Sequence, residues 1–193
     1  MQYEAVVIGV SAGGLTALSE ILKELPGNYP LPLIVIQHRS KDERTLLEEI
    51  LQAKCAINIR QADEKERIEG GKVYFAPPDY HLLVERDRSF SLSCDEPVNY
   101  SRPSIDLLFD SASEVYKDKL VGVILTGANH DGAEGIRAIK ERGGLTIAQD
   151  PATSLFPDMP LAAIDTGSVQ HILTAPAIKD FLLDLAKNQS DHA

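Results

Sequence analysis

An unbroken apolar run near the amino end, Ala5-Val6-Val7-Ile8-Gly9-Val10, leads directly into a turn of small residues, Ser11-Ala12-Gly13-Gly14. Apolar residues then recur at helical spacing from Leu15 to Leu25, and Gly27 and Pro30 end that helix. A continuous apolar run of this length is typical of a strand that is buried on both faces of a parallel sheet. The order of strand, tight turn and helix therefore predicts the first unit of an open α/β sheet.

The same alternation continues along the chain. Further apolar runs of strand length occur at Leu33–Gln37, Leu120–Leu125 and Leu145–Ala148. Amphipathic stretches of helical period lie between them, at 46–51, 105–116 and 136–139. This pattern predicts an α/β fold with a doubly wound, mostly parallel sheet flanked by helices.

One segment departs from the alternation. Val73–Ala76 and His81–Val84 flank the turn sequence Pro77-Pro78-Asp79-Tyr80, and 89–93 could add a third short strand. Two short apolar runs around such a turn predict a β-hairpin inserted into the α/β frame.

Length, composition and charge exclude several classes of protein. The chain has 193 residues, of which 44% are hydrophobic and 25% charged, the proportions of an ordinary globular domain. We expect a single domain over 1–187 and a polar, frayed tail over 188–193. The 19 basic and 29 acidic residues give a net charge of −10, which argues against a nucleic-acid partner.

Cysteine usage and the amino terminus bear on location. Cys55 and Cys94 lie far apart and outside any C-x-x-C pattern, so neither a disulfide framework nor a zinc ribbon is expected. No run approaches the roughly 18 apolar residues of a membrane span, and Met1–Glu4 lacks the basic region of a signal peptide. We therefore expect no membrane insertion and a cytoplasmic location.

The turn at Ser11 has three interpretations when it is taken alone. Ser11 could cap a helix that the glycines pack against the strand. The turn could cradle a phosphate, although Ser11 stands where G-x-G-x-x-G has its middle glycine, and the second strand ends at Gln37 rather than at a carboxylate. It could also be a nucleophile elbow, because Gly9-x-Ser11-x-Gly13 matches G-x-S-x-G.

Polar residues follow two other strands. His38 comes directly after the second strand, and Asp131 lies in the segment 126–135 that follows the third. Because the carboxyl ends of parallel strands meet at one edge of a sheet, Ser11, His38 and Asp131 are expected to share a crevice. They could act there as nucleophile, general base and orienting carboxylate. Alternatively, His38 could be a structural residue whose hydrogen bonds are satisfied by its neighbours, and Asp131 could only cap a turn or helix.

A metal site is not predicted. His130 stands beside Asp131, but no second histidine follows at i+4, and no cluster of cysteine or glutamate supports coordination. No metal or other cofactor is therefore expected.

Blocks of sequence in a specific order show that the chain resembles the catalytic domain of bacterial chemotaxis receptor methylesterases, from about Ala5 to Leu173. The blocks are Ile8–Gly14, Val35–His38, Gly71–Pro78 with His81-Leu82, Arg102–Asp106, Leu125–Gly135, Ala148–Asp150 and Met159–Ile164.

The resemblance implies hydrolysis of glutamate γ-methyl esters on the signalling helices of chemoreceptors, with release of methanol. Many members of the family also deamidate receptor glutamines, so the resemblance implies this second activity as well. By motif position it assigns the nucleophile to Ser11, the base to His38 and the carboxylate to Asp131. It places a backbone oxyanion donor at Ala128, and Ala12 lies at the helix N-terminus beneath the nucleophile. Arg102 either lines the cleft or has a structural role, with equal weight.

The chain also departs from the family pattern. Ala128-Asn129 stands where Met-Gly is usual, and Arg39–Arg44 replaces a proline-rich loop, which bears on substrate preference. We expect that no receiver domain precedes residue 1 and that the phosphorylation switch of the family is missing. Control is then expected from abundance, receptor affinity or a separate regulatory partner. The competing hypotheses are a nucleotide- or phosphate-binding module and an inactive homologue that serves as an interaction domain.

Overall fold

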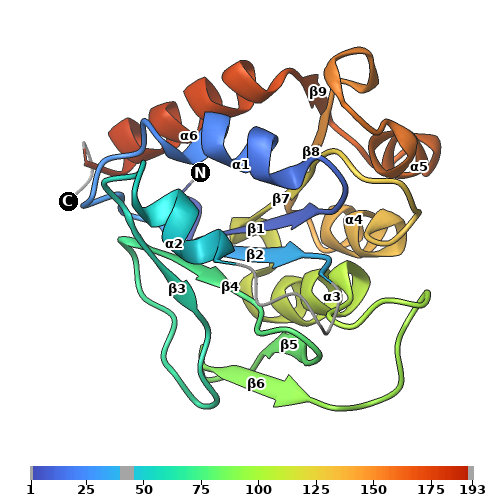
Figure 1. Ribbon diagram of the computed structural model, residues 1–193, viewed down its shortest axis with the longest axis horizontal. Helices are drawn as coiled ribbons and strands as arrows, with labels where there is room; N and C mark the ends of the chain where they lie inside the picture. Colours follow the sequence, from blue (N-terminus) through green and yellow to red (C-terminus); the bar gives the residue numbers. More distant parts are fainter. Residues whose placement is uncertain (1, 40–45, 191–193) are drawn as a thin grey trace.

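The computed structural model describes residues 2–39 and 46–190, and in this part of the chain a seven-stranded parallel sheet forms the centre (Figure 1). The strand order is β3-β4-β2-β1-β7-β8-β9, and a separate two-stranded sheet pairs β5 with β6. The strands are β1 (Ala5–Val10), β2 (Leu33–Gln37), β3 (Asn58–Gln61), β4 (Lys72–Phe75), β5 (His81–Val84), β6 (Phe90–Ser93), β7 (Leu120–Ile124), β8 (Leu145–Gln149) and β9 (His171–Leu173). The helices are α1 (Gly14–Leu22), α2 (Leu47–Gln52), α3 (Ile105–Tyr116), α4 (Ala133–Glu141), α5 (Asp158–Asp165) and α6 (Ala175–Ser190), with short 3₁₀ turns at Lys117–Lys119 and Pro151–Thr153.

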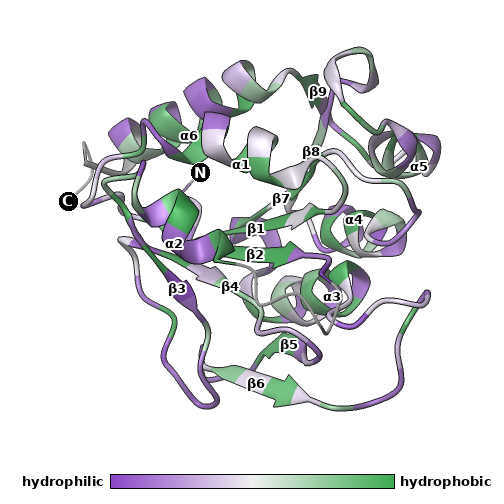
Figure 2. Cartoon of the chain, in the orientation of Figure 1, coloured by the Kyte–Doolittle hydropathy of each residue, from purple (hydrophilic) through white to green (hydrophobic). Residues whose placement is uncertain are grey.

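Helices cover both faces of this sheet, which confirms the doubly wound α/β fold. Alternate side chains of β1 enter two separate cores: Val6 and Ile8 pack with α1, α2 and α6, whereas Ala5 and Val7 pack with α3, α4 and α5. All six residues of β1 are buried, which explains why its sequence is continuously apolar. In Figure 2 the central strands are hydrophobic along most of their length, and the polar residues gather on the outer faces of the helices.

The hairpin is present, but the prediction of its strands was wrong. Residues 73–76 do not pair with His81–Val84, because β4 lies between β2 and β3 in the main sheet. Val73, Tyr74 and Phe75 are each fully buried, as a strand covered on both faces must be. The hairpin instead joins β5 to β6, with His81 opposite Ser93 and Val84 opposite Phe90.

Several elements were not predicted from the sequence. β3 and β9 are short edge strands whose residues are partly exposed, so they lack a continuous apolar run. The last helix, α6, packs Ile178 and Leu182 into the core beside α1. It continues to Ser190, so the helix includes 188–190, which the sequence assigned to a frayed tail. No helix among the described residues combines the length and the apolar character needed to cross a membrane.

The strand order reverses between β1 and β7, and this reversal positions the site. From β1 the chain proceeds to β2 on one side, whereas β7 and β8 lie on the other side. In an open α/β sheet, ligands bind beyond the carboxyl ends of the strands at such a switch point. Ser11 follows β1, His38 follows β2, and Asp131 belongs to the segment that follows β7.

Candidate active site

The turn that carries Ser11 is a tight link between β1 and α1. The Ser11 N–H donates to the Thr126 carbonyl at 3.0 Å, and the Ser11 carbonyl accepts from Gly14 N–H at 2.9 Å. Gly13 caps α1 with a φ of 77°, a left-handed conformation that glycine adopts without steric cost. The turn therefore places the Ser11 side chain at the carboxyl edge of the sheet.

Two side chains brace this turn from neighbouring strands. Gln37 Nε2 donates to the Ser11 carbonyl at 2.9 Å and to the His38 carbonyl at 3.1 Å, so one amide joins the ends of β1 and β2. Thr126 Oγ1 donates to the Ala12 carbonyl at 3.0 Å and accepts from Phe156 N–H at 2.9 Å. Neither bracing role can be predicted from the sequence, because both side chains act on residues that are distant in sequence.

His38 and Asp131, which are 93 residues apart in sequence, are joined by a hydrogen bond. His38 Nε2 lies 2.8 Å from Asp131 Oδ2, and Asp131 is only 1% exposed. The carboxylate also accepts from the N–H groups of Ile105 at 2.7 Å and Asp106 at 3.1 Å, and from Ser104 Oγ at 3.1 Å. Asp131 therefore occupies the N-terminus of α3, where a negative charge is favourable.

The environment of Asp131 keeps this carboxylate ionised. Burial by itself would raise the pKa of Asp131, but the hydrogen bond from His38 and the backbone N–H groups of Ile105 and Asp106 outweigh it. The pKa of Asp131 is therefore lowered from its ordinary value. An ionised carboxylate at this place can hold one orientation of the His38 ring.

Asp106 forms the reciprocal contact with α4. Its Oδ1 accepts from Gly132 N–H at 2.9 Å and from Gly135 N–H at 2.8 Å. Burial raises the pKa of Asp106 to about 6; the N–H groups of Gly135 and Gly132 oppose this rise, and the nearby charge of Asp131 adds to it. Asp131, which precedes α4, thus accepts from the first N–H groups of α3, and Asp106, in the first turn of α3, accepts from N–H groups at the start of α4. In the sequence, Asp106 stands out only as the last residue of the block Arg102–Asp106, with no signal for this contact.

Asn129 contacts the other nitrogen of the His38 ring. Asn129 Nδ2 lies 3.2 Å from His38 Nδ1, and Asn129 Oδ1 accepts from Asp131 N–H at 3.1 Å. Ser11 Oγ makes no hydrogen bond to the described residues. Ser11 and His38 nevertheless line one cavity of about 270 Å³, together with Gly13, Gly14, Leu15, Thr16, Gln37, Arg39 and Leu47.

None of the three further residues predicted to contact the substrate, Ala12, Ala128 and Arg102, is among the described residues that line this cavity. Among the described residues, no acceptor binds the N–H groups of Ala12 and Ala128, so both remain available as donors. Arg102 does not line the cavity; its guanidinium bonds Asp79 Oδ1 at 2.7 and 2.9 Å and the carbonyls of Cys94 and Asp95. These contacts tie the turn before β5 to the segment after β6.

The loop expected to affect substrate preference lies mostly outside the described residues, which omit 40–45. Its first residue, Arg39, is described. The Arg39 guanidinium forms an ion pair with Glu48 of α2 and donates to the Ala76 carbonyl at 3.2 Å.

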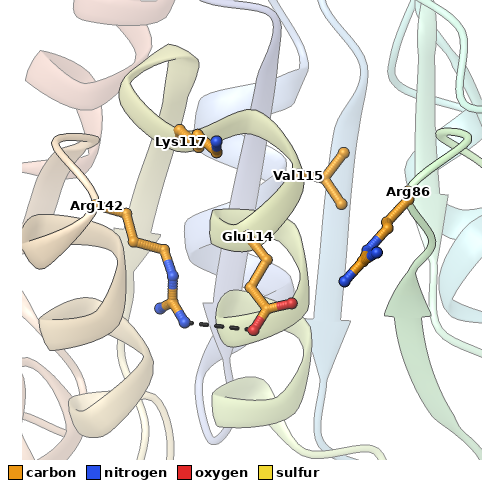
Figure 3. Close-up of a pocket in the computed structure, with 5 residues that line it drawn as sticks. All are labelled: Arg86, Glu114, Val115, Lys117 and Arg142. Atoms are coloured by element: carbon orange, nitrogen blue, oxygen red, sulfur yellow. Dashed lines mark ion pairs between the residues drawn. The ribbon is translucent and has the colours of Figure 1, made fainter.

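A larger hollow, of about 620 Å³, lies at the C-terminal end of α3 (Figure 3). Its lining residues are Arg86, Glu114, Val115, Lys117 and Arg142, and Arg142 forms an ion pair with Glu114 at 3.5 Å. The described residues that line this hollow include no serine, histidine or cysteine that could act as a nucleophile or as an imidazole base. The smaller cavity at Ser11 is therefore the candidate active site.

Comparison with known proteins identifies the family. The family model described as CheB methylesterase matches residues 6–182. A Leptospira interrogans protein with the provisional name protein-glutamate methylesterase/protein-glutamine glutaminase is 51% identical over 188 residues, which cover 97% of each chain. A Carboxydothermus hydrogenoformans protein with the same double name is 41% identical over 92% of this chain, and the match spans 54% of that protein. The crystal structure of the Thermotoga maritima CheB methylesterase catalytic domain is similar with a TM-score of 0.91 and 34% identity, over 96% of this chain and 100% of that one.

Fold and relatives together define an α/β enzyme of the hydrolase class. The chain belongs to the CheB methylesterase family. These matches confirm the resemblance, the enzyme class and the fold class that the sequence predicts.

Proposed function

We propose that this chain is a serine esterase that hydrolyses glutamate γ-methyl esters on chemoreceptor signalling helices. Ser11 is the nucleophile, His38 the general base and Asp131 the carboxylate that orients His38. The observation that carries the proposal is the His38–Asp131 hydrogen bond of 2.8 Å beside the cavity that Ser11 and His38 both line. Residues 1–187 form the catalytic unit, and the cytoplasm is the expected location.

The first half of the reaction forms an acyl-enzyme. His38 takes the proton from Ser11 Oγ as this oxygen attacks the ester carbonyl, and Asp131 stabilises the imidazolium that results. The negative oxygen of the tetrahedral intermediate accepts from the N–H groups of Ala12 and Ala128, which have no acceptor among the described residues. Methanol leaves with the proton from His38, and a γ-glutamyl ester remains on Ser11.

The second half releases the acid. His38 removes a proton from water, which attacks the acyl-enzyme, and the proton returns to Ser11 Oγ as the glutamate carboxylate departs. A glutamine amide passes through the same intermediate with ammonia as the leaving group. The double name of the relatives supports this second activity. No step needs a metal or a cofactor.

Substitution of the nucleophile tests the proposal. Ser11→Ala should abolish methanol release from methylated receptor membranes and labelling by a serine-directed fluorophosphonate probe. Its fold should persist, because alanine fits a turn of small residues. Ser19→Ala in α1, which lies outside the cavity lining, is the matched control and should keep both signals. Turnover near that of the parent protein in Ser11→Ala would show that Ser11 is not the nucleophile.

A further inference from the structure

The hydrogen bonds around Asn129 determine which ring nitrogen of His38 carries the proton. The backbone N–H of Asp131 can only donate, so the Asn129 atom that it contacts at 3.1 Å must be the oxygen Oδ1. The amide nitrogen Nδ2 then faces His38 Nδ1 at 3.2 Å. Because an amide NH₂ can only donate, Nδ1 must be the unprotonated nitrogen that accepts.

The other ring nitrogen agrees with this assignment. His38 Nε2 lies 2.8 Å from the Asp131 carboxylate, which also accepts from two N–H groups of α3 and is ionised. A neutral imidazole with its proton on Nε2 donates to this carboxylate and accepts from Asn129. Both contacts are satisfied by this one tautomer.

The same nitrogen is the one that a general base must use. With Nε2 directed at Asp131, only Nδ1 can take the proton of Ser11, and in this structure Asn129 occupies Nδ1. We propose that Asn129 is a positioning residue that holds His38 as the neutral Nε2–H tautomer and yields Nδ1 to Ser11 when substrate binds. This inference rests on the proposed role of His38 as the base.

Few other charged groups adjoin the His38 ring in the described part of the chain. Asp131 faces Nε2, and Asp106 lies behind it in α3. On the segment of His38 itself, Arg39 is paired with Glu48 of α2. The contact at Nδ1 comes from a neutral amide, so Asn129 adds no charge beside the ring. A change at Asn129 alters this contact and the one between Asn129 Oδ1 and Asp131 N–H.

Two substitutions separate the amide donor from the rest of the side chain. Asn129→Asp keeps an oxygen for Asp131 N–H but replaces the donor with a carboxylate oxygen, which attracts a proton to Nδ1. Asn129→Ala removes both the donor to His38 Nδ1 and the acceptor of Asp131 N–H, without adding a charge. If the donor stabilises the neutral ring, the pH at which kcat/KM reaches half its maximum should rise by about 0.5 to 1 unit in the alanine variant, the effect of one ordinary hydrogen bond. It should rise further in the aspartate variant.

The matched control is His130→Ala, an exposed residue of the same loop whose side chain takes no part in these contacts. Its pH profile should coincide with that of the parent protein. A merely structural effect of position 129 would lower the rate and the unfolding temperature without moving the pH midpoint. That result, or a midpoint that falls, would overturn the inference.

A spectroscopic measurement tests the tautomer independently of turnover. Ser11→Ala protein with nitrogen-15-labelled histidine should show His38 protonated at Nε2 and not at Nδ1 above the pH midpoint of the profile. In the Ser11→Ala, Asn129→Asp double variant, the Nδ1 proton should persist to higher pH. A signal from Nδ1–H in the Ser11→Ala protein above that midpoint would refute the assignment. By contrast, the expected tautomer together with an active Ser11→Ala variant would refute the proposed function alone.

Discussion

Replacing Asp106 by asparagine should stabilise this protein at neutral pH, although Asp106 accepts two backbone hydrogen bonds. The carboxyl group has a pKa of about 6, raised by burial and by the charge of Asp131. An unfolded aspartate has a pKa of about 3.9, so above pH 6 the folded protein carries a charge that costs on the order of 2–3 kcal/mol relative to the unfolded chain. Asparagine keeps an oxygen for the N–H groups of Gly132 and Gly135 and removes that charge.

The sign of the pH dependence follows from proton binding. Between about pH 4 and pH 6 the folded protein holds the Asp106 proton more tightly than the unfolded chain, so the stability of the parent protein falls there as pH rises. Asp106→Asn removes this dependence. The free-energy difference between variant and parent should be near zero at pH 4 and grow to about 1–3 kcal/mol above pH 6.5, after allowance for relaxation around the site.

Urea unfolding at pH values from 4 to 8 measures this difference directly. Asp118→Asn, which changes an exposed carboxylate of the 3₁₀ turn after α3, is the matched control, and its effect should be small at every pH. A variant that is less stable than the parent at pH 7, or a difference that does not change with pH, would refute the reasoning.

Two further substitutions test how the site is assembled. In Asp131→Asn, an amide NH₂ replaces one oxygen of a carboxylate that accepts from four donors. We expect the free energy of unfolding, measured in urea, to fall by about 2–4 kcal/mol. Turnover should fall by a factor approaching ~10⁴, as in serine proteases that lose this carboxylate. Because the pKa of Asp131 is lowered, the stability that Asp131 contributes is present above about pH 4 and disappears as pH falls below its folded pKa. The variant should lack this pH dependence. A methanol-release rate within a few-fold of the parent would show that Asp131 only caps α3. Thr126→Val leaves Phe156 N–H and the Ala12 carbonyl without the hydroxyl, and should lower kcat/KM about tenfold as well as stability by about 1–3 kcal/mol. Thr146→Val, which removes a similarly buried hydroxyl from β8, should lower stability alone, and an equal rate loss in both variants would contradict the bracing role of Thr126.

The sequence alone was enough to predict that Ser11, His38 and Asp131 lie at one edge of the sheet, as they do in the structure. β1, β2 and β7 lie at the middle of a sheet that helices cover on both faces, so each is an uninterrupted apolar run whose end is easily located. Ser11 and His38 come at the ends of two of these runs. Since parallel strands present their carboxyl ends at one edge, residues at these ends are near one another whatever the details of packing.

Only the tertiary structure decided the partners of these residues. The run Val73–Phe75 could pair with β5 or join the main sheet, and its sequence is equally apolar in either case; burial of both its faces selects the sheet. The exchange of carboxylates between α3 and α4, the bracing by Thr126 and the contact of Asn129 with His38 Nδ1 depend on distances of a few ångströms between residues that are remote in sequence. The spacing of apolar residues in the sequence indicates only which side chains face the core and which face the solvent, because a helix or strand buries one of its faces as a unit. A hydrogen bond also requires a particular direction and partner, and these exist only after the elements have packed.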